Sequence, residues 1–396
     1  MSPILVSPIP ESTMRIPLLT SRGQATCLIL AFLWCLPGFA LGQSTSDAQE
    51  FKAETVVTGL ENVWGMVFLP NGDLLVTERP GRLRIVRDGK LLETPVPGTP
   101  TVHARGQGGL LDIALHPDFE TNRLVYFSYS KPVGDNSTTA IARGKLENDA
   151  LTNVEDIFVA NSKGGGHYGS RMVFDNDGYL FFSVGDRQAS PMKDRMSHPA
   201  QDRSNHHGTI NRIHDDGRIP ADNPFVNQNG FEPSIWSYGH RNPQGMTIDR
   251  STGNIWATEH GPQGGDELNL VLKGVNYGWP VIGQGVNYGG AKIHDTDNLA
   301  GMQTPIHYWV PSIATAGVLF YTGTGLPGWT GNIFVGGLVG QQVARLTMDG
   351  QTVTSEETIY AGKGRIRDIE QGPDGNIYLG IDGETGKPGI VRLSSK

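Results

Sequence analysis

Cysteine is nearly absent from this chain of 396 residues. The two cysteines, Cys27 and Cys35, both lie within the first 42 residues, so a chain without that stretch would contain none. Such a chain can form no disulfide bond, which leaves core burial and bound metal ions as sources of stability. It also has no thiol for nucleophilic catalysis and no cysteine ligand for zinc.

Sequence motifs of several enzyme classes are also missing. The chain has no HExxH, no GxSxG and no GxGxxG opening a helix after a strand, so a zinc protease, an α/β-hydrolase and a nicotinamide site are not indicated. His206 and His207 are adjacent but have no third ligand at a recognisable spacing, which disfavours zinc there. Lysines and arginines form no run and the net charge is −8, so we expect no nucleic-acid partner.

The N-terminal region differs from the rest of the chain. An apolar run, ATCLILAFLWCLPGFALG, follows Arg15 and Arg22, but it is short and contains a proline, which disfavours a membrane span. The small residues before Gln43 match the pattern that signal peptidases recognise. We therefore predict that residues 1–42 are a secretory signal peptide, cleaved near Gly42 and Gln43. The mature chain would be periplasmic or secreted, without an integral membrane span; a retained N-terminal anchor is the alternative.

Glycine and proline are abundant, with 53 and 25 residues, which indicates many turns and few long helices. Six segments share one pattern: a short apolar strand, a turn rich in Pro, Asn, Asp and Gly, and a second strand with aromatic or β-branched residues. Their starts lie roughly 45 to 75 residues apart, a spacing typical of propeller blades. The segments begin at Val63, Gly109, Ser170, Pro243, Ala316 and Ile366.

This repetition predicts an all-β fold in which residues 43–396 form a single six-bladed β-propeller. Two β-sandwich domains are the alternative, although no linker-like composition divides the chain. In a propeller the loops at one end converge on a shared cleft, so residues far apart in sequence can meet there. Polar residues are concentrated in the segments HARGQGG, NSKGGGHYGS, SYGHRNPQG, EHGPQGGDELN and GRIRD.

Arginines in these segments indicate an anionic ligand. Arg241, Arg365 and Arg367 would repel one another in a shared cleft unless they face an anion such as a carboxylate or phosphate. The alternative is three separate surface salt bridges. Arg365 and Arg367 are two residues apart, so their side chains are expected on one face of a strand.

A histidine and an acidic turn are further candidates. His167 lies among glycines that allow close backbone approach to a ligand, and a neutral imidazole is a common general base. An ordinary polar loop residue is the alternative. The turn GPQGGDE offers backbone carbonyls and two carboxylates, Asp266 and Glu267, which are oxygen ligands suited to calcium.

The loop segments together resemble one known family. GQGGLLDIALHPDF, GHYGSRMVF, YGHRNPQG, EHGPQGGDELN, GVNYGWP and GRIRD occur in the order found in the soluble quinoprotein glucose/sorbosone dehydrogenases. The chain looks most similar to the aldose sugar dehydrogenase branch, from about Glu54 to Leu393. The resemblance implies a six-bladed propeller that binds pyrroloquinoline quinone (PQQ) and calcium over its central channel. PQQ has three carboxylates, which would give the arginines an anion to face.

The resemblance also implies roles for individual residues. His167 matches the general base, which takes the proton from the anomeric hydroxyl of the sugar. Arg241 and Asn242 match the pair at the quinone oxygens, where Arg241 also stabilises developing negative charge. The other residues expected at the cofactor site are Gln107, His260, Asp266, Tyr288, Ser312, Arg365 and Arg367, of which Asp266 supports the calcium-binding turn.

Two calcium sites are implied in the same way. Gly261 and Pro262 match positions whose backbone carbonyls hold the cofactor's calcium ion, which polarises the quinone as a Lewis acid. Glu267 and Tyr277 match a second, structural calcium site. One departure from the family concerns Val339, which occupies a position where a lysine commonly pairs with PQQ.

The implied function is the PQQ- and calcium-dependent oxidation of aldose sugars at C1 to lactones. Electrons would pass to an unidentified external acceptor, because the chain has no CxxCH motif for haem attachment. The alternatives are a calcium-dependent propeller lactonase and a non-catalytic propeller that binds sugars. The sequence also contains an extra loop of about 30 residues, from Ala189 to Arg218, whose length is unusual for a connection between strands.

Overall fold

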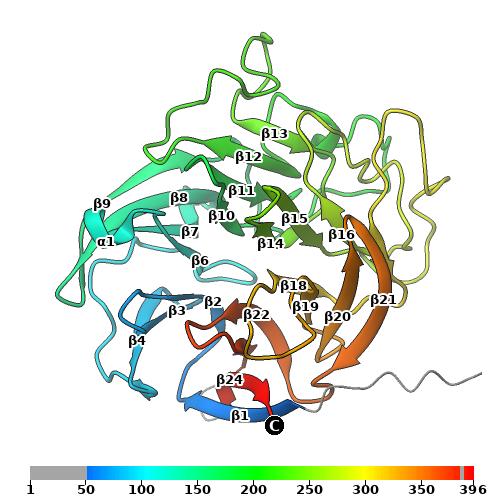
Figure 1. The fold of residues 1–396 in the computed structure, drawn as a ribbon. Coiled ribbons are helices and arrows are strands. Elements are labelled where there is room, and N and C mark those ends of the chain that lie inside the picture. Colours follow the sequence, from blue (N-terminus) through cyan, green and yellow to red (C-terminus); the bar gives the residue numbers. More distant parts are fainter. Residues whose placement is uncertain (1–50, 384–387) are drawn as a thin grey trace, which may run out of the picture. The chain divides into compact units, whose positions relative to one another are not determined.

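A computed structural model describes residues 51–383 and 388–396, so the expected signal peptide lies outside the described residues. The described chain forms six antiparallel sheets of four strands each, arranged as blades around a common centre (Figure 1). The prediction of an all-β, six-bladed propeller is confirmed. Only two short helical segments interrupt the strands of the described residues, α1 (Phe119–Asn122) and η1 (Pro199–Gln201), and no described helix has the length and apolar character needed to span a membrane.

The first three blades follow the chain in order from the inside outward. Their strands are β2 (Val63–Phe68), β3 (Leu74–Glu78), β4 (Arg82–Arg87) and β5 (Lys90–Leu91); β6 (Leu110–Leu115), β7 (Leu124–Val133), β8 (Asn136–Glu147) and β9 (Ala150–Val159); and β10 (Met172–Phe174), β11 (Leu180–Val184), β12 (Thr209–Ile213) and β13 (Ile235–Tyr238).

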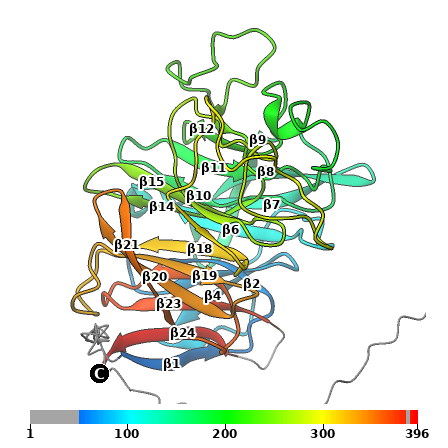
Figure 2. The ribbon, with the colours of Figure 1, turned by 90° about the vertical axis from the view of Figure 1, so that its right-hand side faces the viewer.

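The next two blades repeat this order, and the last is completed by the N-terminal strand. Strand β1 (Phe51–Thr58) pairs with β24 as the outermost strand of the sixth blade, and the two lie side by side in both views (Figures 1 and 2). The remaining strands are β14 (Pro243–Asp249), β15 (Asn254–Glu259), β16 (Asp266–Leu270) and β17 (His307–Trp309); β18 (Thr315–Phe320), β19 (Ile333–Gly337), β20 (Gln342–Asp349) and β21 (Thr352–Ile359); and β22 (Arg365–Gln371), β23 (Ile377–Asp382) and β24 (Pro388–Ser395).

Apolar side chains between neighbouring sheets form the core. One buried cluster joins β3 and β4 to the next blade, with Leu75 and Ile85 packed in the same group as Ile113 and Phe127. Because each sheet packs on both faces, strands such as β3 and β11 are buried at every residue. The short hairpins between paired strands use glycine where the backbone needs a positive φ, as at Gly72 in the PNGD turn (φ +89°).

The innermost strands contact one another in order, and β22 contacts β2, which closes the ring. Five of these six strands, β2, β6, β14, β18 and β22, have a register shift against their neighbour within their first few residues. In β22, Ile366 pairs with Ile381 and Asp368 with Gly380, so Arg367 is the extra residue of a bulge. Such bulges re-aim side chains, here at one end of the ring.

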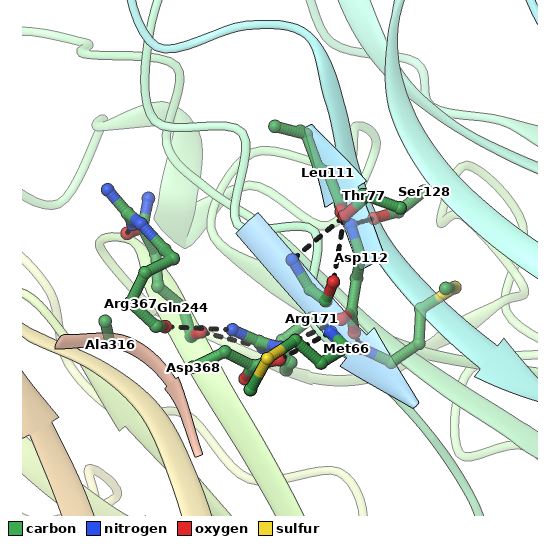
Figure 3. A network of polar contacts seen from close by, with 12 residues as sticks. Met66, Thr77, Leu111, Asp112, Ser128, Arg171, Gln244, Ala316, Arg367 and Asp368 are labelled. Atoms are coloured by element: carbon green, nitrogen blue, oxygen red, sulfur yellow. Dashed lines mark hydrogen bonds and ion pairs between the residues drawn. The ribbon is translucent and has the colours of Figure 1, made fainter. Parts of the chain in front are cut away.

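A buried arginine connects the inner strands below this end (Figure 3). Nη1 of Arg171 lies 2.8 Å from Oδ1 of Asp112 in β6 and 2.7 Å from Oδ1 of Asp368 in β22. Its Nε donates to the carbonyl of Gln244 in β14 at 3.0 Å. The guanidinium lies over the ring of Trp64 in β2, 4.5 Å from its centroid. Arg171, which precedes β10, thus ties together five of the six blades.

The expected loop from Ala189 to Arg218 is shorter than predicted, because Thr209–Ile213 forms strand β12. The connection from β11 to β12 contains η1 and contacts the connection that follows β16. Nε2 of Gln201 donates to the carbonyl of Trp279 at 2.7 Å, and Nδ2 of Asn276 donates to Oε1 of Gln201 at 2.7 Å. The loop thereby fixes the segment that carries Trp279.

Candidate active site

The topology of a blade brings two chain segments to the same place. The innermost strand and its neighbour are antiparallel, so the residue before the first strand and the residue after the second lie at one end of the sheet. His167 precedes β10 and Asp186 follows β11, while Arg241 precedes β14 and His260 follows β15. Side chains separated by many residues therefore gather over the centre of the ring.

These side chains line a cavity of about 480 Å³. A second cavity of about 210 Å³ has Gln107, His167, Arg241 and Tyr288 in common with the first and is also lined by Asp186 and Trp279. The first cavity contains eight of the residues expected from the sequence: Gln107, His167, Arg241, Asn242, His260, Tyr288, Arg365 and Arg367.

His167 is held in a defined orientation and has a free ring nitrogen. Its Nδ1 lies 2.6 Å from Oδ1 of Asp186, and its backbone N–H donates to Oε1 of Gln107 at 2.7 Å. Its φ of +43° is unusual for a residue with a side chain and is stabilised by these contacts. Burial lowers the pKa of His167, so the neutral ring carries its proton on Nδ1, where the carboxylate accepts it. No described residue hydrogen-bonds Nε2.

Asp186 accepts three hydrogen bonds. Besides His167, Nε1 of Trp279 donates to Oδ2 at 2.8 Å and the backbone N–H of Gln188 donates to Oδ1 at 2.9 Å. Burial disfavours the charged carboxylate, but the bond from His167 and the charge of Arg241 outweigh it, and the pKa of Asp186 is below its usual value. Asp186 is therefore ionised while His167 is neutral.

Arg241 and Asn242 are fixed by contacts to neighbouring loops. The backbone N–H of Arg241 donates to Oε2 of Glu259 at 2.6 Å, and its Nη1 donates to the carbonyl of Gly261 at 2.9 Å. Its Nε is buried and has no partner among the described residues. Oδ1 of Asn242 accepts the backbone N–H of Gly169 at 3.0 Å, which joins this loop to the one that carries His167.

The cavity lining also includes Arg365 and Arg367 together with polar side chains. Nη1 of Arg367 donates to Oε1 of Gln244 at 2.6 Å, and Nη2 donates to Oδ2 of Asp382 at 3.2 Å. Nε2 of His260 lies 3.1 Å from the same Gln244 oxygen. Burial, Arg241 and Arg367 lower the pKa of His260 well below its usual value, so this ring is neutral and donates to Gln244.

The expected calcium-binding turn lies beside the cavity. Oδ1 of Asp266 accepts the backbone N–H of Gly261 at 2.9 Å, while the hydroxyl of Ser312 donates to Oδ2 at 2.7 Å. Asp266 and Ser312 are thus behind the turn and do not line either of the two cavities described above. Pro262 lines the second cavity.

A smaller cavity of about 20 Å³, large enough for one ion or water molecule, lies behind the same turn. It is lined by Glu259, Gly261, Glu267 and Tyr277 among others. Burial and the neighbouring charge of Glu259 raise the pKa of Glu267 to about 8. The hydroxyl of Tyr277 donates to the carbonyl of Leu270 and accepts the backbone N–H of Leu272. Among the described residues, no three His, Cys, Asp or Glu side chains form a metal-binding group.

Comparison with known proteins identifies the family. Residues 60–392 match the sequence model described as glucose / sorbosone dehydrogenase. The chain belongs to this family. It is 41% identical over 355 residues to an aldose sugar dehydrogenase of Escherichia coli, and the alignment covers 87% of this chain and 93% of that protein. The resemblance drawn from the loop segments is confirmed, and membership makes the protein an oxidoreductase.

Solved structures of the glucose/sorbosone dehydrogenase family have the same fold. The soluble aldose sugar dehydrogenase from Escherichia coli, in its apo form, has a TM-score of 0.81 and 38% identity, covering 88% of this chain and 100% of that one. The PQQ-bound form of the aldose sugar dehydrogenase from Streptomyces coelicolor has a TM-score of 0.71 and 27% identity, covering 88% and 99%.

Several residues that line the cavities of this dehydrogenase were not predicted from the sequence. Asp186 follows the apolar strand segment FFSVG, but charged residues are common in turns after strands, so its position in the sequence did not indicate a role beside His167. Trp279 lies in the expected GVNYGWP segment but gives no sign that its indole reaches Asp186. The first cavity is also lined by Asn62, Trp64, Arg79, Gln244, Leu338, Asp382 and Gly383.

Proposed function

We propose that this protein oxidises aldose sugars at C1 to lactones, using PQQ and calcium, and passes the electrons to an external acceptor. One observation carries the proposal: a neutral, oriented His167 shares a cavity with a cluster of arginines. The name of the Escherichia coli relative, an aldose sugar dehydrogenase, supports the substrate class. The PQQ-bound relative from Streptomyces coelicolor supports the cofactor.

The side chains of the first cavity fit PQQ. Four of the described lining residues are arginines, whereas Asp382 is the one carboxylate among them. The Nε atoms of Arg241 and Arg367 are buried without partners, so each guanidinium retains a donor. An excess of positive charge in the cavity lining favours a ligand with several carboxylates.

Calcium would be held mainly by backbone oxygens. The carbonyls of Gly261 and Pro262 would bind the cofactor's ion, and Asp266 would fix the turn through the N–H of Gly261. A second ion would bind Glu267 and the carbonyl of Tyr277 in the small cavity. The raised pKa of Glu267 fits this role, because a cation would compensate the buried charge of its carboxylate.

His167 is the proposed base. PQQ, when bound, supplies the acceptor for two electrons and the C1 hydrogen of the sugar. Nε2 of His167 accepts the proton of the anomeric hydroxyl, and the Nδ1–H bond to Asp186 stabilises the imidazolium that forms. Arg241 and Asn242 would hold the quinone end of the cofactor, and the positive charge of Arg241 would stabilise negative charge there. Gln107, His260, Tyr288, Arg365 and Arg367 would position the cofactor, with Ser312 acting through Asp266.

We also propose that the protein is exported to the periplasm or secreted. The basic residues, short apolar run and small residues before Gln43 support a signal peptide over residues 1–42. The external acceptor would then be a component outside the cytoplasm.

The test uses purified mature protein loaded with PQQ and calcium. We expect aldoses to reduce a dye acceptor, and His167→Ala to retain PQQ while losing turnover. The proposal fails if no aldose supports dye reduction and no PQQ absorbance remains after desalting. Calcium-dependent hydrolysis of lactones without PQQ would instead indicate the hydrolase alternative.

A further inference from the structure

The first cavity contains one more cation than the sequence analysis identified. Arg79 follows β3, and its side chain lines the cavity together with Arg241, Arg365 and Arg367. With Asp382 as the one lining carboxylate among the described residues, the four guanidinium groups leave three positive charges in excess. This number equals the three carboxylates of PQQ.

Among the described residues, no carboxylate forms an ion pair with Arg79. Its Nη1 donates to the carbonyl of Gly106 at 2.9 Å, and its Nη2 donates to Oδ1 of Asn62 at 3.4 Å, a long and weak bond. Its Nε is buried without a partner among the described residues. The adjacent carboxylate, Glu78, pairs with Arg82 at 2.6 Å and with Arg84 at 3.4 Å.

Arg79 is close enough to the other arginines to influence them. Burial lowers the pKa of Arg367 to about 10, and the charges of Arg79 and Arg365 add to this effect although Asp382 opposes it. Like charges held together in a protein are stabilised when an anion binds between them. By contrast, Val339 is uncharged and 66% exposed, and it does not line the cavity.

We propose that Arg79 is a cofactor-binding residue that contacts a carboxylate of PQQ and supplies the positive charge that a lysine commonly supplies at the position of Val339. The inference rests on the proposed function, since it takes PQQ as the occupant of the cavity. It explains how a chain with valine at position 339 retains a charge balance with the cofactor. It also gives an anionic partner to the guanidinium of Arg79, which has no carboxylate partner among the described residues.

The test is an equilibrium binding titration of apoprotein with PQQ in the presence of calcium at several salt concentrations. Binding is measured by equilibrium dialysis or by fluorescence quenching. Arg79→Gln is expected to raise the Kd about tenfold at low salt, or about 1.4 kcal/mol. The difference should shrink as salt increases, because screening weakens the ionic contact. Arg105→Gln is the matched control: it removes the same charge from an exposed arginine near Gly106 that does not line the cavity.

A lysine variant separates charge from loop positioning. Arg79→Lys keeps the charge, so it should bind PQQ more tightly than Arg79→Gln does. If the two variants have the same Kd for PQQ, Arg79 acts through its bond to Gly106 and not through its charge. That result overturns the proposal, as does an Arg79→Gln Kd within twofold of the unchanged protein. If the unchanged protein binds no PQQ, the proposed function fails and the role of Arg79 fails with it. If the unchanged protein binds PQQ, and the Arg79 variants bind it as tightly as the Arg105→Gln control does, the role of Arg79 fails while the proposed function stands.

Discussion

Replacing Asp186 with asparagine removes the negative charge that orients His167. The effect on activity depends on the three hydrogen bonds that the carboxylate accepts. Oδ1 accepts from Nδ1 of His167 and from the N–H of Gln188, and Oδ2 accepts from Nε1 of Trp279. An asparagine has one oxygen and one NH2 group, so in either orientation its NH2 group faces a donor. At least one of the three bonds is lost, and the bond that remains to His167 is no longer charge-assisted.

The expected loss follows from that bond. A hydrogen bond to a charged group contributes about 1.5–3 kcal/mol, which corresponds to a roughly 10- to 100-fold decrease in kcat/KM. The pH profile should move in a defined direction. Burial already lowers the pKa of His167 and Asp186 raises it, so Asp186→Asn lowers this pKa further. The base is then neutral at lower pH, and the acid limb of kcat/KM shifts to lower pH while the plateau falls.

The assay is aldose-dependent dye reduction by protein loaded with PQQ and calcium, measured across pH, with the Kd for PQQ measured separately. Asp177→Asn is the control, because this exposed aspartate lies in the β10–β11 turn at the other end of the same blade. An acid limb that moves to higher pH, or a plateau equal to that of the control, would refute the role assigned to Asp186. A change confined to PQQ affinity would refute it equally.

Three further perturbations probe other parts of the protein. Arg171→Met leaves Asp112 and Asp368 buried without a cation and should lower the free energy of unfolding in urea by about 3–5 kcal/mol. Arg218→Met is the control, because its pair with Asp216 is at the surface and should contribute at most about 1 kcal/mol. Equal losses would contradict the central role of Arg171. The pKa of Glu267 is raised from 4.5 to about 8, so the calcium-free protein should become less stable as the pH rises between these values. Glu267→Gln should flatten this pH dependence in thermal melts and reduce the rise in Tm on adding calcium. An unchanged rise in Tm would show that Glu267 does not bind the ion. Val339→Lys should leave the Kd for PQQ unchanged in a titration of apoprotein, because position 339 does not line the cavity, and a lower Kd would show that a lysine at this position reaches the cofactor.

The blades were predictable from the sequence because each hairpin has its own local signal, such as the glycine of the PNGD turn. His167 and Arg241 were also accessible, since they precede innermost strands and loops at that end converge. Two other residues that line the cavities, Asp186 and Arg79, were not. Asp186 and Arg79 follow second strands, where charged residues are common in any turn, and only the pairing of β10 with β11 and of β2 with β3 places them at the cavity.

Geometry within the strands was less predictable than their existence. Arg365 and Arg367 were expected on one face from a spacing of two, and both line the cavity. Strand alternation is not what places Arg367 there, however, because Arg367 is the extra residue of a bulge that interrupts the alternation of side chains along β22. Bulges leave no reliable mark in a single sequence, since they are fixed by pairing with a partner strand. The same limit applies to Ser312, which sequence order places near the cofactor site but which hydrogen-bonds Asp266 behind the turn.

The pairing of β1 with β24 has a consequence for how the protein is made. The two strands are paired from Phe51 with Ser395 to Thr58 with Pro388, with register shifts between Thr55 and Thr58, so the sixth blade contains both the beginning and the end of the described chain. A nascent chain cannot form this contact until almost all of its residues are available, and the sequence separation makes ring closure slow relative to hairpin formation. Until then β24 has no outer neighbour and presents an open edge to other chains. Completion of the ring, rather than formation of any single blade, therefore marks the point at which the protein is protected from strand exchange with its neighbours.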